Sequence, residues 1–199
     1  MLYTTAHYPL DPQLAQTAIF QATIEPKRRL GKRTTGWHSE YRYTIESAGP
    51  FKPVLAHILA LYPQLALDRW WINVCGPTES TEAHYHGHNM TSIVYYIQTP
   101  EHSGNIEFKD PNSWFDDNNA WVGYAPSAGD IVAFDGMLLH RVGANNSNDI
   151  RVSIALNLVT KEEFKRTEWS RARSTAIPPE VNLEDAYTHI NSTRAPGTR

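Results

Sequence analysis

The stretch that decides the fold covers residues 130–157 and reads DIVAFDGMLLHRVGANNSNDIRVSIALN. It contains two apolar runs, 131–134 and 152–156, on either side of a polar turn. Short apolar runs bounded by turn residues are typical of β-strands. A single histidine, His140, lies where the first run gives way to the turn, and Arg151 opens the second run eleven residues later.

The second run carries polar side chains at alternate positions. Arg151, Ser153, Ala155 and Asn157 would share one face of a strand, because successive side chains point to opposite sides. An arginine and a serine side by side on an inward face form a carboxylate receptor, in which the guanidinium takes both oxygens and the hydroxyl adds a third donor. A histidine nearby, His140, is a candidate metal ligand.

The chain before this stretch continues the strand pattern. In 69–74 (RWWINV) the period is two, with Trp71 and Asn73 on one face and the other apolar side chains on the opposite face. Further strands are expected at the end of 84–97 and at 106–110 and 121–125, separated by polar turns. Several short strands at this spacing predict a mainly β barrel or sandwich.

Two helices are expected before the strands. One begins at Asp11-Pro12, and the other covers 53–65, where apolar residues recur at helical spacing and pack on a sheet. His57 on the second helix is interpreted as a surface or core histidine. The basic segment 26–36 is either a solvated loop or a lid that contacts an anionic substrate.

The predicted organisation is a single domain of 199 residues. Residues 1–68 form a helical support region, 69–160 form the β core, and 161–199 form a polar extension with a helix at 161–171 and a loosely ordered tail.

Composition limits the classes of function. The net charge of −3 gives no sign of general nucleic-acid binding, and no apolar run is long enough to span a membrane. The lone Cys75 cannot form an internal disulfide, and no signal peptide is visible, so a cytoplasmic protein is expected. The sequence offers no view on the oligomeric state.

Three of the nine histidines fall within 84–88. His84 and His86 are two residues apart, so on a strand both imidazoles point the same way, and His140 can complete a metal-binding face if the strands are neighbours. Non-haem Fe(II) oxygenases need three ligands on one face and open positions opposite. Their usual third ligand is a carboxylate, and here the matching position is His86.

The segment 70–158 resembles the Fe(II)/2-oxoglutarate-dependent dioxygenases, and in particular a branch of small members from bacteria and phages. The shared motifs are Trp71-Ile72-Asn73, His84-Tyr85-His86, Ser92-Ile93-Val94-Tyr95-Tyr96, Gly129-Asp130, Leu138-Leu139-His140-Arg141-Val142, and Arg151-Val152-Ser153 through Asn157. The segment GWHS (36–39) is similar to an upstream motif of that branch. The resemblance implies a double-stranded β-helix, a cupin-like jelly roll with N-terminal helices packed on one sheet.

The resemblance also implies site residues. It assigns His84, His86 and His140 to Fe(II), with His86 in place of the usual carboxylate. It assigns Arg151 and Ser153 to the distal carboxylate of 2-oxoglutarate, joined by Tyr96 and, on motif position and alternation, by Asn73 and Asn157. Trp37, Trp114 and Trp121 are candidates for the substrate mouth, although core packing is the simpler interpretation of each.

The expected activity is hydroxylation of a C–H bond in a small molecule or in an amino-acid or peptidyl substrate. The cosubstrates would be 2-oxoglutarate and O2, and the co-products succinate and CO2. Alternatives are a cupin-like metal barrel without oxygenase activity, or a related oxygenase that halogenates or desaturates. A shift in register could use His88 with His86 in place of His84, and Asp135, expected in a turn, could supply a carboxylate.

Overall fold

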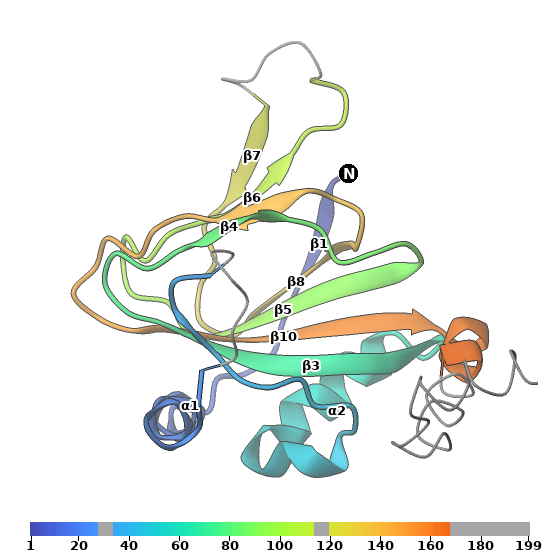
Figure 1. The fold of residues 1–199 in the computed structure, drawn as a ribbon, viewed down its shortest axis with the longest axis horizontal. Helices are drawn as coiled ribbons and strands as arrows, with labels where there is room; N and C mark the ends of the chain where they lie inside the picture. Colours follow the sequence, from blue (N-terminus) through green and yellow to red (C-terminus); the bar gives the residue numbers. More distant parts are fainter. Residues whose placement is uncertain (28–33, 114–119, 168–199) are drawn as a thin grey trace, which may run out of the picture. The chain divides into compact units, whose positions relative to one another are not determined.

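The computed structural model describes residues 1–27, 34–113 and 120–167. Residues 1–164 form one compact unit built from two antiparallel β-sheets, with helices α1 and α2 against the larger sheet (Figure 1). The elements are β1 (Tyr3–His7), α1 (Gln13–Ile24), β2 (Trp37–His38), the 3-10 helix η1 (Glu46–Phe51), α2 (Lys52–Leu61), β3 (Leu65–Cys75), β4 (Thr81–His84), β5 (Met90–Gln98), β6 (Ile106–Lys109), β7 (Trp121–Tyr124), β8 (Asp130–Asp135), β9 (His140–Val142) and β10 (Arg151–Thr160). The predicted mainly β class is therefore confirmed.

The larger sheet has the strand order β1-β8-β5-β10-β3-β2, and the smaller sheet has the order β4-β9-β6-β7. In the larger sheet, β10 lies between β3 and β5, with Ser153 opposite both Asn73 and Tyr96. This pairing of neighbours aligns the predicted polar face of β10 with polar positions on both adjacent strands. The second apolar run of the 130–157 stretch is thus the centre of the site-bearing sheet.

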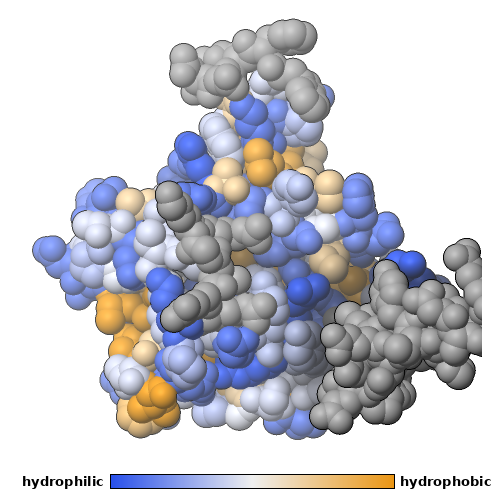
Figure 2. Space-filling view, viewed as in Figure 1, coloured by the Kyte–Doolittle hydropathy of each residue, from blue (hydrophilic) through white to orange (hydrophobic). Residues whose placement is uncertain are grey.

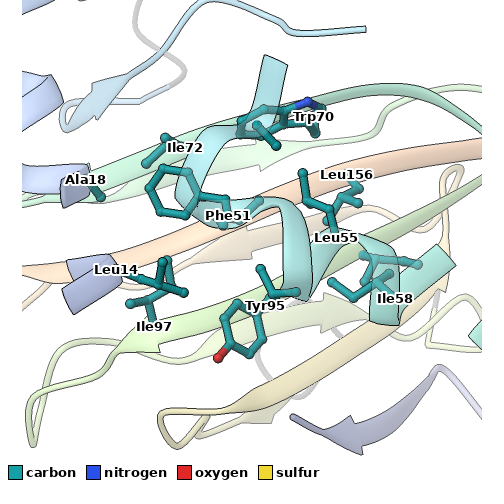
Figure 3. Close-up of a cluster of buried hydrophobic side chains, with 14 of the residues drawn as sticks. Leu14, Ala18, Phe51, Leu55, Ile58, Trp70, Ile72, Tyr95, Ile97 and Leu156 are labelled. Atoms are coloured by element: carbon teal, nitrogen blue, oxygen red, sulfur yellow. The ribbon is translucent and has the colours of Figure 1, made fainter. Parts of the chain in front are cut away.

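The opposite face of the larger sheet packs on the helices. Phe51, Leu55 and Ile58 from η1 and α2 lie over β3, β5 and β10, as Figure 3 shows. The strand residues that meet them are Trp70, Ile72, Ile93, Tyr95, Ile97, Ile154, Leu156 and Leu158. This apolar layer, formed by the alternate residues of three strands, gives the sheet a rigid base.

Helix α1 covers the sheet only along one side. It buries Leu14, Ala15 and Ala18, while Phe20 and Ile24 are exposed. Figure 2 shows an apolar patch in the region where Figure 1 draws α1. No helix among the residues 1–27, 34–113 and 120–167 is long and apolar enough to cross a membrane.

Helix α2 is shorter than the sequence predicts. It ends at Leu61, and Leu65, expected to close the helix, is the first residue of β3. Pro63 explains the difference, because proline lacks an N–H and disfavours helical geometry in the preceding residue. Residues 161–167 are helical, as expected for the start of the predicted 161–171 helix, and the remainder lies outside the described residues.

The inner faces of the two sheets meet in a second, smaller core. Its buried members come from β5, β6 and β8: Tyr96, Ile106, Phe108, Val132 and Phe134. The smaller sheet also contains β4, formed by Thr81–His84, a strand that the sequence pattern did not predict. The two facing sheets enclose a cavity lined by the three predicted histidines, Arg151 and Ser153.

Candidate metal centre

A cavity between the sheets is lined by residues of both. Its polar lining includes the three predicted histidines together with Asn73, Arg151 and Ser153. Tyr96 also lines it, whereas Asn157 is not among the lining residues. The cavity thus brings together polar residues as far apart in the chain as Asn73 and Ser153.

His84, His86 and His140 form a compact cluster, in which one ligand atom of each lies within 4.8 Å of the others. His84 ends β4 and lies directly opposite His140 on β9. His86 lies beyond the end of β4, so the strand that was expected to align the pair stops at His84. The backbone N–H of His86 donates to the carbonyl of Gly136 at 2.8 Å, and this contact holds the third histidine beside the other two.

Two of the three imidazoles are oriented by backbone carbonyls. Nδ1 of His84 lies 2.8 Å from the carbonyl oxygen of Glu82, and Nδ1 of His140 lies 2.9 Å from that of Leu138. A carbonyl can only accept, so each Nδ1 carries the proton and each Nε2 keeps its lone pair. Histidine ligands of metals commonly have this arrangement.

His140 is also held in its neutral form. Burial, followed by the nearby His84, lowers the pKa of His140 to about 4. A neutral imidazole is the form that binds a metal, so His140 is in its metal-binding form at neutral pH. The donor set therefore fits a divalent transition metal such as Fe(II).

The third histidine has a different partner. Nδ1 of His86 lies 3.4 Å from Nδ2 of Asn157, and Oδ1 of Asn157 accepts from the hydroxyl of Ser92 at 3.1 Å. Asn157, predicted to bind the cosubstrate, therefore lies beside the histidines. No sequence signal other than its place in the motif pointed to this contact.

Arg151 is a buried cation whose partners are neutral. Its Nη1 donates to the carbonyls of Ser103, Gly104 and Gly143, and its Nη2 lies 3.2 Å from Sγ of Cys75. The residue is 5% exposed, and no carboxylate among the described residues pairs with it. A buried charge without a counter-ion is costly, so the position favours an anion in the cavity.

The groups beside Arg151 offer further donors. Asn73 Nδ2 lies 3.5 Å from the hydroxyl of Ser153, and both side chains line the cavity. The hydroxyl of Tyr96 is buried and has no hydrogen-bond partner among the described residues. Burial raises the pKa of Tyr96, while the charge of Arg151 lowers it, so the phenol remains a neutral donor. Arg151, Ser153 and Tyr96 can together hold a carboxylate.

Two of the predicted tryptophans, Trp37 and Trp121, do not line the cavity. Trp37 Nε1 donates to the carbonyl of Glu25, and Trp121 packs against the guanidinium of Arg141, whose Cζ lies 4.2 Å from the ring centroid. Trp114 lies outside the described residues.

The aromatic wall beside the histidines is formed by Trp71, His38 and Tyr41 instead. His38 stacks on Trp71, with ring centroids 5.5 Å apart, and Tyr41 meets Trp71 edge to face at 5.3 Å. Trp71 could have been identified from its alternation with Asn73, and His38 from the GWHS motif, but nothing in the sequence signalled Tyr41.

The alternative ligands lie elsewhere. His88 is exposed and does not belong to the cluster. Asp135 is at the end of β8, where its Oδ1 accepts from the backbone N–H of Met137 at 2.7 Å, as expected for a turn residue. The structure therefore brings together the set without a carboxylate.

Comparison with known proteins identifies one family. The profile of a family described as "Putative 2OG-Fe(II) oxygenase" matches residues 69–157, the segment that contains all three histidines and Arg151. No curated protein matches the chain.

Solved structures share the fold. A prolyl-4-hydroxylase from Pseudomonas putida is 15% identical with a TM-score of 0.56, covering 80% of this chain and 92% of that one. The non-heme alpha-ketoglutarate-dependent epimerase SnoN from nogalamycin biosynthesis is 18% identical with a TM-score of 0.60, covering 79% and 76%. HygX from Streptomyces hygroscopicus, with nickel and 2-oxoglutarate bound, is 10% identical with a TM-score of 0.59, covering 80% and 83%. At these identities the likeness concerns the fold, a double-stranded β-helix.

Proposed function

We propose that this chain, whose residues 69–157 match the model of a 2OG-Fe(II) oxygenase family, is an oxygenase of that kind and hydroxylates an unactivated C–H bond. The proposed substrate is a small molecule, an amino acid or a peptidyl side chain. Fe(II), 2-oxoglutarate and O2 are the cofactor and cosubstrates, and succinate and CO2 are the co-products.

The observation that supports this proposal is the uncompensated charge of Arg151 in the cavity of the histidine cluster. The guanidinium is fixed by backbone carbonyls on one side, and no carboxylate among the described residues neutralises it. A ligand with a carboxylate would remove the cost of this buried charge, and a metal on the histidines would hold the other end of the same ligand. A keto acid with two carboxylates meets both requirements.

The residues then have separate roles. His84, His86 and His140 would hold Fe(II), which with the keto acid supplies the activation of O2. Arg151 and Ser153 bind the distal carboxylate, and the Tyr96 phenol donates to the keto acid. Asn73 orients the Ser153 hydroxyl.

The aromatic wall completes the site. Trp71, His38 and Tyr41 lie on the side of His86, since the ring centroids of Trp71 and His86 are 5.6 Å apart. Apolar ring faces exclude water from the reacting atoms and leave space for a hydrocarbon part of the substrate.

The absence of a carboxylate ligand changes the charge of the centre. Three neutral imidazoles leave the full +2 charge of iron in place, whereas a carboxylate ligand would reduce it to +1. A dianionic cosubstrate gains attraction from this difference. Halogenation would be disfavoured if His86 held the metal, because its imidazole would take the coordination position that a chloride needs.

A metal-binding barrel without oxygenase activity is the competing function. The histidine cluster alone would suit a structural metal. A metal bound to the histidines would not, however, offset the buried charge of Arg151, whose partners are neutral. The two functions differ in one measurable property, the dependence on a keto acid.

The test is aerobic turnover of 2-oxoglutarate to succinate by the Fe(II)-loaded protein, screened across small molecules, free amino acids and peptides. Succinate formation that requires both Fe(II) and a substrate, with a product heavier by one oxygen atom, would support the proposal. Tight metal binding with no affinity for 2-oxoglutarate would refute it in favour of the metal barrel.

A further inference from the structure

The three histidines differ in what faces Nδ1. For His84 and His140 the partner is a backbone carbonyl, which only accepts and therefore fixes the proton on Nδ1 whether or not a metal is bound. For His86 the partner is the side-chain amide of Asn157, which can donate through Nδ2 or accept through Oδ1. The position of the proton on His86 is thus set by how this amide is oriented.

The amide is itself held by one side chain. Asn157 on β10 lies directly opposite Ser92 on β5 in the antiparallel pairing, and both are almost fully buried. The Ser92 hydroxyl donates to Oδ1 of Asn157 at 3.1 Å, and Nδ2 of Asn157 lies 3.4 Å from Nδ1 of His86. In this arrangement Nδ1 of His86 accepts, so the neutral imidazole carries its proton on Nε2.

A metal ligand at Nε2 requires the reverse arrangement. If the amide turns over, Oδ1 accepts from Nδ1–H of His86 and Nδ2 donates to Ser92 Oγ. The serine hydroxyl can donate or accept, so the contact between Ser92 and Asn157 and the contact between Asn157 and His86 are both kept when the amide turns over. The proton count of His86 is unchanged, because one proton leaves Nε2 and one is gained at Nδ1.

We propose that Ser92 and Asn157 form a reversible hydrogen-bond relay that positions His86 and sets its tautomer. In the metal-free protein the Asn157 amide donates to Nδ1 of His86, and when metal is bound it accepts from Nδ1–H. This inference rests on the proposed function only in requiring that the three histidines bind a metal. Asn157 and Ser92 are positioning residues, since they act through His86.

The first measurement is the tautomer of each histidine from long-range nitrogen–proton NMR spectra. In the metal-free protein, His84 and His140 should carry the proton on Nδ1 and His86 on Nε2. With Zn(II) bound, all three should carry it on Nδ1. A metal-free His86 protonated on Nδ1 would show that the relay does not reverse.

The second measurement is the affinity for Co(II) and its visible spectrum without keto acid. Asn157→Leu removes the relay and should weaken Co(II) binding about 10- to 100-fold. The carboxylate of Asn157→Asp can only accept from Nδ1–H of His86, as the amide does in the metal-bound arrangement. The Co(II) affinity of this variant should therefore lie within about threefold of the parental affinity. Asn157→Asp binding as weakly as Asn157→Leu would contradict the relay.

The matched control is Asn145→Leu. Asn145 is also fully buried, and its Nδ2 donates to the carbonyls of Cys75 and Asp149 and not to a histidine. This variant should lose unfolding free energy in the metal-free state while keeping parental Co(II) affinity. Equal losses of affinity in the Asn145 and Asn157 leucine variants would reduce the role of Asn157 to general stability.

Two outcomes separate the inference from the proposed function. A folded Asn157→Leu that binds Co(II) as tightly as the parent overturns the relay and leaves the metal centre intact. A parent protein that binds no Co(II) overturns both. If Asn157→Leu does not fold, Asn157→Asp and Ser92→Ala decide, and Ser92→Ala should bind Co(II) more weakly than Asn157→Asp.

Discussion

Replacement of Arg151 by leucine should weaken 2-oxoglutarate binding in a way that depends on one carboxylate. Nη1 is engaged by three backbone carbonyls and Nη2 by the Cys75 sulfur, while Nε has no partner among the described residues. Two donors, Nε–H and the second Nη2–H, therefore remain for a ligand. One charge-assisted hydrogen bond is worth about 1.5–3 kcal/mol, so the loss of one bond should lower the affinity at least about tenfold and the loss of two bonds more than about a hundredfold.

The assay is anaerobic calorimetric titration of the metal-loaded protein with 2-oxoglutarate and with 2-oxopentanoate, which lacks the distal carboxylate. The parent should bind 2-oxoglutarate at least about tenfold more tightly than 2-oxopentanoate, and more than about a hundredfold if both free donors of Arg151 are used. Arg151→Leu should bind both keto acids with similar, weak affinity. The affinities of the parent and of Arg151→Leu for the two keto acids form a thermodynamic cycle. Its coupling energy measures the interaction between Arg151 and the distal carboxylate.

The matched control is Arg42→Leu, which removes an arginine that pairs with Glu25 and does not line the cavity. It should leave the preference for 2-oxoglutarate unchanged. The reasoning fails if folded Arg151→Leu still prefers 2-oxoglutarate to 2-oxopentanoate by the parental factor.

Four further predictions concern the metal centre and its surroundings. Because the pKa of His140 is lowered to about 4, the unfolded chain binds a proton at this residue below pH about 6.5, whereas the metal-free folded chain does not until about pH 4. The free energy of unfolding should therefore fall by about 3 kcal/mol between pH 7 and pH 4. Urea titrations should show a smaller fall for His140→Gln. Gly136→Ala places a Cβ 2.8 Å from the carbonyl oxygen of Gly87 and from Cβ of Met90, so the loop that carries His86 must shift, and Co(II) affinity should fall while circular dichroism shows an intact fold. His86→Ala should cut succinate formation severely, whereas His86→Asp should keep metal and part of the turnover; equal inactivity of the two would contradict a ligand role for His86. Cys75→Ser should retain most activity and the parental mass in non-reducing gels, because the thiol is buried and its sulfur accepts from Arg151, as a hydroxyl also can.

The sequence predicted the polar face of the large sheet because that face depends only on alternation. Arg151, Ser153 and Asn73 reach one cavity by the two-residue period of their strands. The period does not say how far along the strand the cavity extends. Asn157 keeps the same face but lies beside His86, two side chains beyond Ser153, where the metal cluster begins.

The sequence predicted the histidine cluster, but the strand geometry from which it was predicted differs from the structure. His84 and His86 were expected to face the same way on one strand, yet β4 ends at His84 and the contact of the His86 backbone with Gly136 aligns the third imidazole. Such a contact joins residues 50 positions apart and leaves no periodic signal. The pairing of His84 with His140 across β4 and β9 was invisible for the same reason, since spacing does not state which strands are neighbours.

The neutral surroundings of Arg151 link the amount of folded protein to the supply of its ligand. An anion that binds only the folded chain at 100 times its dissociation constant adds about 2.7 kcal/mol to the unfolding free energy. Proteases act on the unfolded fraction, so a cell rich in the keto acid would degrade this chain more slowly than a depleted one. The half-life of the protein in the cell would then depend on the concentration of the keto acid, through the charge of Arg151.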